Sequence, residues 1–124
     1  MYTVDEKAFE GIISNAIDAI PEQYFKHLNN VAFVMENEPT PEQREKLQLH
    51  CNQSLFGLYE GIPLTKRGNG YNLVLPDKIT VFKHPIEAHS TSHQDMQQLV
   101  NKTVWHEVAH FYGLDHDRIH KLEQ

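Results

Sequence analysis

Apolar positions near the start of the chain recur every three or four residues, the spacing of an amphipathic helix with one buried face. These positions are Phe9, Ile12, Ile13, Ala16, Ile17 and Ile20. Thr3 and Glu6 have the spacing of a capping box, which predicts where this helix begins. Pro21 ends the helix and opens a short second one over Glu22–Leu28, because proline suits a first helical position.

The middle of the chain contains short apolar runs separated by turn residues. The run Val31–Met35 is rich in branched and aromatic residues and predicts a buried strand, and Leu55–Tyr59 and Ile79–Phe82 predict two further strands. Between the first two strands, the capping pattern at Thr40–Gln43 predicts a short helix that runs to about Leu49.

The last third of the chain contains a long helical pattern, after Pro85 has ended the third strand. Ser90–Ser92 offer several N-cap residues, and the helix is expected to run to about Tyr112. Its apolar face consists of Met96, Leu99, Val100, Thr103, Val104 and Ala109. Gly113 stands where a helix C′ glycine belongs, and a short terminal helix is expected from about Asp117. The elements together predict an α+β fold, with a small sheet backed by two principal helices.

Length and composition limit the possible classes. A chain of 124 residues predicts one domain over residues 1–124, with enough core to fold without disulfides, which the single Cys51 could not form internally. A net charge of −6 argues against a nucleic-acid platform. Asp5, Glu6 and Lys7 stand where the apolar part of a signal peptide would begin, and no apolar run is long enough to span a membrane. We therefore expect a cytoplasmic protein without nucleic-acid or membrane partners.

Histidine is concentrated where the long helix ends. Seven of the nine histidines lie between His84 and His120. His106 and His110 are four residues apart, so both imidazoles project from one face of the predicted helix and suit a Zn²⁺ ion. Glu107 lies about 100° round the helix, where its carboxylate can take a proton from a zinc-activated water and deliver it to a leaving amine. The His-Glu-x-x-His pattern therefore predicts a catalytic zinc site.

A third ligand is expected beyond the helix. Gly113 lets the chain turn back towards the metal, and His116 has the spacing that best completes a three-histidine site with one position open for water. Asp115 and Asp117 flank it, and either could bind the metal instead or orient a ligand imidazole. The same ligands also accept other divalent ions.

At this point the sequence resembles the small bacterial zincin-like metallopeptidases, once catalogued as a domain of unknown function. The resemblance covers most of the chain. It rests on the opening amphipathic helix and on Ile20-Pro21, Asn30-Val31, Gly57-Leu58-Tyr59-Glu60-Gly61-Ile62-Pro63-Leu64, Leu75-Pro76-Asp77-Lys78-Ile79-Thr80 and His106–Ile119. It implies a minimal zincin fold: a small mixed sheet, a backing helix and the active-site helix. The family often has aspartate where His116 stands and histidine where Phe111 stands, so the ligand set departs from the usual pattern.

The preferred hypothesis is a zinc-dependent metallopeptidase that hydrolyses a peptide or protein substrate. An extended peptide is expected to add to the edge of the sheet at Leu55–Glu60, with Ile79–Phe82 more central. Tyr59, Tyr71 and Tyr112 are each a candidate donor to the oxyanion, although packing is the more ordinary role for a tyrosine. Two alternatives remain: a non-catalytic zinc-binding interaction module, and a hydrolase of a non-peptide amide or ester.

Overall fold

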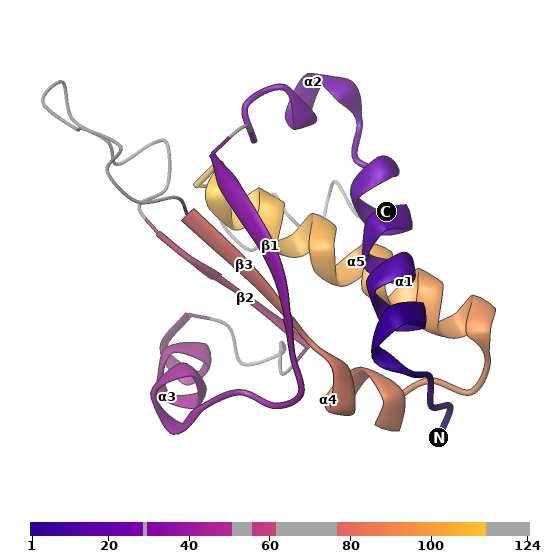
Figure 1. Ribbon diagram of the computed structural model, residues 1–124. Helices are drawn as coiled ribbons and strands as arrows, with labels where there is room; N and C mark the ends of the chain where they lie inside the picture. Colours follow the sequence, from indigo (N-terminus) through magenta and orange to yellow (C-terminus); the bar gives the residue numbers. More distant parts are fainter. Residues whose placement is uncertain (29, 51–55, 62–76, 114–124) are drawn as a thin grey trace, which may run out of the picture.

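In the computed structural model, which describes residues 1–28, 30–50, 56–61 and 77–113, a three-stranded sheet lies against two long helices (Figure 1). The elements in chain order are α1 (Glu6–Asp18), α2 (Glu22–Phe25), β1 (Val31–Glu36), α3 (Pro41–His50), β2 (Gly57–Glu60), β3 (Asp77–Phe82), α4 (Lys83–Ala88) and α5 (His93–Phe111). α1 and α5 lie on one side of the sheet, and α3 lies on the other. The predicted α+β architecture is confirmed. The terminal helix expected from about Asp117 lies outside the described residues.

The sheet is mixed, with strand order β1-β3-β2. β1 runs parallel to β3 with Val31 opposite Asp77, and β2 runs antiparallel to β3 with Gly57 opposite Val81. β3 is therefore central, as the sequence predicts, and β2 is an edge strand of the described sheet. The prediction of a buried strand at β1 is wrong, because β1 forms the other edge and all six of its residues are only half-buried.

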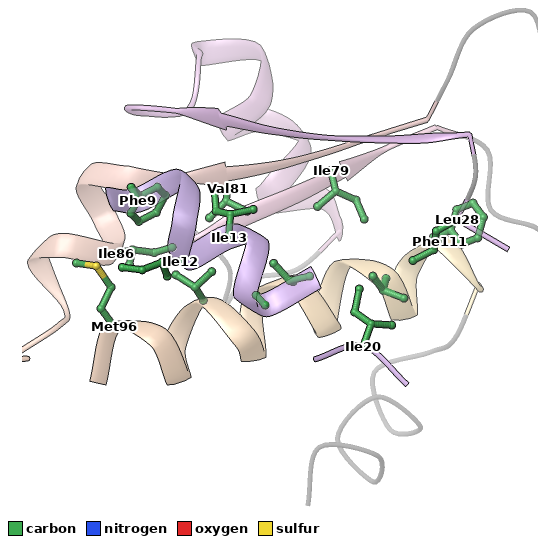
Figure 2. Packing of buried hydrophobic residues seen from close by; sticks show 14 residues of the cluster. Phe9, Ile12, Ile13, Ile20, Leu28, Ile79, Val81, Ile86, Met96 and Phe111 are labelled. Atoms are coloured by element: carbon green, nitrogen blue, oxygen red, sulfur yellow. The ribbon is translucent and has the colours of Figure 1, made fainter. Parts of the chain in front are cut away.

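The core lies between the sheet and the two long helices (Figure 2). Alternate residues of β3, Ile79 and Val81, face the helices and have no exposed surface. The predicted stripe of α1 supplies Phe9, Ile12 and Ile13 to the same cluster. From α5 come Met96, Val100, Val104 and Val108, all fully buried. The hydrophobic periodicity of both helices therefore identifies the faces that position α5 against the sheet.

α1 begins later than its sequence predicts. Its N-cap is Asp5, whose carboxylate accepts a hydrogen bond from the N–H of Ala8 at 2.7 Å, rather than Thr3. The preceding residues are held by α4: the Tyr2 N–H donates to the Glu87 carbonyl and the Val4 N–H donates to the Glu87 carboxylate. Because these bonds hold residues 2–4 against α4, the helix starts only after Val4.

The other helix ends follow their predicted signals. Thr40 and Gln43 form a reciprocal capping box, in which each side chain accepts from the backbone N–H of the other residue. Ser92 caps α5 by accepting from the Asp95 N–H at 3.1 Å. Gly113 follows α5 with a φ of 77°, a left-handed conformation that glycine adopts without strain.

α4 is an element that the sequence does not predict. The helix follows β3 directly and places Pro85 in its first turn, where a missing backbone N–H breaks no helical bond. The strand therefore ends at Phe82, three residues before the proline that was expected to end it. Lys83 and Glu87, one turn apart in α4, form an ion pair of 3.0 Å that is almost fully buried.

Within the described parts of the chain, no helix combines the length and the apolar character needed to cross a membrane. The cytoplasmic location stays a prediction.

Candidate metal centre

The last two turns of α5 bring together His106, Glu107 and His110. The two imidazole rings lie one helical turn apart, with centroids separated by 4.8 Å and planes inclined by 73°. One potential ligand atom from each of the three residues lies within 4.8 Å of the others. The two imidazoles offer nitrogen ligands that suit Zn²⁺, and the carboxylate lies beside them. The group therefore fits a metal ion.

Glu107 is the most deeply buried member of the group, with only 3% of its surface exposed. Its Oε1 accepts a hydrogen bond of 2.9 Å from the backbone N–H of Tyr59 in β2. Burial raises the pKa of Glu107 to about 8, and the hydrogen bond from Tyr59 offsets only part of that effect. In the metal-free protein the Glu107 carboxyl therefore stays largely protonated at neutral pH, whereas a cation bound beside it would favour the ionised form.

The register of β2 explains why the Tyr59 N–H points at the helix. The Phe82 N–H donates to the Phe56 carbonyl at 2.8 Å, which fixes one hydrogen-bonded pair of the antiparallel ladder. Such pairs alternate along a strand, so Leu58 and Glu60 direct their backbone groups at β3. The backbone groups of Tyr59 point away from β3, towards the outer edge of the described sheet. That edge lies at α5, where Glu107 meets the Tyr59 N–H.

Two of the three tyrosines considered as oxyanion donors have other partners. The Tyr59 hydroxyl donates to Asp77 Oδ2 at 2.7 Å, and its ring packs edge-on against Phe111 with centroids 5.9 Å apart. The Tyr112 hydroxyl donates to the backbone carbonyl of Tyr24. Both side chains therefore fix the packing around α5. Tyr71 lies outside the described residues.

The predicted third ligand, His116, lies outside the described residues, as do its alternatives Asp115 and Asp117. The choice among them stays a prediction, and so do the roles assigned to His106, Glu107 and His110. The structure adds a contact that sequence reasoning missed, the Tyr59 N–H that holds Glu107. The edge position of β2 was a partial signal for it, but no sequence pattern shows which amide of an edge strand faces a helix.

The fold and the site define a class: an α+β protein with a His–Glu–His metal-binding group on a helix that packs against an antiparallel edge strand. A family model described as zincin-like metallopeptidase matches residues 28–124. The chain belongs to the zincin-like metallopeptidase family, which confirms the resemblance seen in the sequence. That family is zinc-dependent. No curated protein matches the chain significantly.

Proposed function

We propose that this chain is a zinc-dependent peptidase in which His106, His110 and His116 hold the metal and Glu107 is the general base and acid. Family membership supports the reaction class. The observation that carries the assignment of Glu107 is its position: a buried carboxylate beside two imidazoles, with one oxygen held by the Tyr59 N–H.

Zinc held by these residues would supply a Lewis acid that polarises the substrate carbonyl and makes water more acidic. The chain's own chemistry is proton transfer at Glu107. Its carboxylate takes a proton from the attacking water, the water oxygen bonds to the carbonyl carbon, and the same carboxyl then gives the proton to the leaving amine nitrogen as the C–N bond breaks. The bond from Tyr59 to Oε1 keeps the carboxylate in one orientation throughout.

An extended peptide is the substrate that we propose, and β2 is where it would bind. The strand is an edge of the described sheet, and it lies directly against the helix that carries Glu107. A peptide that extends along this edge would bring its carbonyl groups close to the metal-binding group. The net charge of −6 supports a protein without nucleic-acid partners.

The test compares three proteins: the wild type, Glu107→Gln and His106→Ala. Each is assayed for zinc content and for cleavage of a broad peptide library. Glutamine cannot take the proton, so Glu107→Gln is expected to keep stoichiometric zinc and to lose hydrolysis by a factor of about 10² to 10⁴. His106→Ala loses an imidazole ligand and is expected to lose zinc as well.

Hydrolysis at the wild-type rate by zinc-loaded Glu107→Gln would show that Glu107 is not the base. Zinc content unchanged in His106→Ala would remove that residue from the metal site. A wild-type protein that binds zinc but cleaves no peptide in the library would overturn the peptidase assignment.

A further inference from the structure

Gly57 in β2 lies beneath the part of α5 that carries Thr103 and, one turn later, Glu107. A Cβ atom placed on Gly57 would lie 2.7 Å from Thr103 Cγ2, 3.1 Å from the Thr80 carbonyl oxygen and 3.5 Å from Glu107 Cγ. The first distance is far below carbon–carbon van der Waals contact. The helix and the strand therefore approach so closely that no side chain fits at position 57.

Thr103 cannot easily make room for a side chain there. It is only 6% exposed, and its hydroxyl donates to the Leu99 carbonyl at 2.8 Å. That hydrogen bond fixes the rotamer of a β-branched side chain and so fixes the direction of the Cγ2 methyl group. On the other side, the Thr80 carbonyl oxygen belongs to the central strand β3 and is held in the sheet. A side chain at position 57 would therefore force α5 and β2 apart.

The same close approach allows Glu107 to reach the edge of the sheet. The Glu107 Cγ lies beside Gly57, and its carboxylate extends two residues along β2 to the Tyr59 N–H, 2.9 Å from Oε1. A separation of even a few tenths of an ångström between helix and strand lengthens that hydrogen bond directly. The spacing set at Gly57 therefore determines where the carboxylate lies.

We propose that Gly57 is a positioning residue for Glu107: its missing side chain lets α5 close onto β2 and so aims the carboxylate at the edge amide of Tyr59. The importance of this carboxylate position for catalysis rests on the proposed function. The contact itself can be measured without any activity.

The experiment measures amide hydrogen exchange by NMR in Gly57→Ala, Thr103→Ser and the double variant, with and without added zinc. In Gly57→Ala the Tyr59 amide is expected to exchange about tenfold faster, the effect of losing one hydrogen bond. The Leu58 and Glu60 amides, which face β3, are expected to keep their protection. Thr103→Ser removes the Cγ2 methyl group but keeps the hydroxyl, so the double variant is expected to recover the protection of the Tyr59 amide.

Gly11→Ala is the matched control, because a Cβ at Gly11 in α1 meets nothing within 4 Å. It is expected to leave the Tyr59 amide unchanged. If the wild type hydrolyses peptides, Gly57→Ala is also expected to lower kcat by about a hundredfold with little change in KM, because the base is misplaced while the substrate edge remains.

Wild-type protection of the Tyr59 amide in Gly57→Ala would overturn the proposal. Equal loss of protection at Leu58, Tyr59 and Glu60 would also overturn it, since that result indicates general loosening of the strand. If Gly57→Ala does not fold, the double variant decides: restored folding with a protected Tyr59 amide supports the proposal, and failure to restore it refutes the proposal. A wild type without peptidase activity would remove the proposed function and leave the exchange result intact.

Discussion

In the metal-free protein, burial of the Glu107 carboxyl should lower the free energy of unfolding. The substitution Glu107→Gln should raise it again. Glutamine has the same shape as glutamate, keeps an oxygen that can accept from the Tyr59 N–H and carries no charge. The substitution therefore isolates the consequence of burying an ionisable group at this position, where only 3% of the residue surface is exposed. A chelator keeps metal out of the comparison.

The magnitude follows from the pKa of Glu107, which burial raises from 4.5 to about 8. The folded protein holds this proton more tightly than the unfolded chain, so unfolding releases it and rising pH favours the unfolded state. Stability is therefore lost as the pH rises from about 4.5 to about 8, and it levels off above that range. At about 1.4 kcal/mol for each pH unit, the loss is roughly 3 kcal/mol at pH 7 and approaches roughly 5 kcal/mol above pH 8.

Urea unfolding of the wild type and Glu107→Gln between pH 7 and 9, with chelator present, measures this difference. The range from pH 7 to 9 brackets the pKa of Glu107, which is about 8. Glu107→Gln is expected to be the more stable protein throughout, by a margin that widens with pH. Glu10→Gln, an exposed change on α1, is expected to match the wild type. A Glu107→Gln protein no more stable than the wild type at pH 8 would refute the reasoning.

Two further predictions concern residues away from the metal-binding group. Tyr112→Phe removes the hydrogen bond to the Tyr24 carbonyl and is expected to lower the free energy of unfolding by about 1 kcal/mol without changing the hydrolysis rate; a large fall in kcat would instead make Tyr112 an oxyanion donor. Glu87→Gln leaves Lys83 buried without its ion-pair partner and is expected to lower stability by about 3 kcal/mol at pH 7 in thermal unfolding. Burial alone would raise the pKa of Glu87, but the hydrogen bonds from Val4 and Lys83 outweigh it and lower the pKa below its ordinary value of 4.5. The wild type should therefore lose this advantage in acid, as the pH falls through that lowered pKa. A gap between the two proteins that does not narrow in acid would contradict this account.

The helices that carry the core and the site could be predicted because their signals are local. Burial of one face leaves a three-and-four spacing in the sequence of α1 and α5, and the Ser92 cap and Gly113 mark the ends of α5 by chemistry within a few residues. The proximity of His106, Glu107 and His110 has the same origin, because helix geometry alone places them together.

The features that were missed depend on contacts between distant parts of the chain. α4 has only six residues and no periodic pattern, and the shifted start of α1 results from bonds between residues 2–4 and Glu87, more than eighty residues away. The bond from Tyr59 to Glu107 needs both the register of β2 on β3 and the approach of α5 at Gly57. Neither the register of β2 nor the approach of α5 can be predicted from the residue at one position of the sequence.

α1 lies before the segment that the family model matches, yet it forms part of the core. The family match begins at residue 28, after α1, whereas Phe9, Ile12 and Ile13 form one wall of the core that contains Ile79 and Val81. A chain trimmed to the matched segment would keep every metal-binding candidate and yet expose the face of β3 that supports the active-site helix. The core that supports the active-site helix therefore extends beyond the matched segment and includes α1.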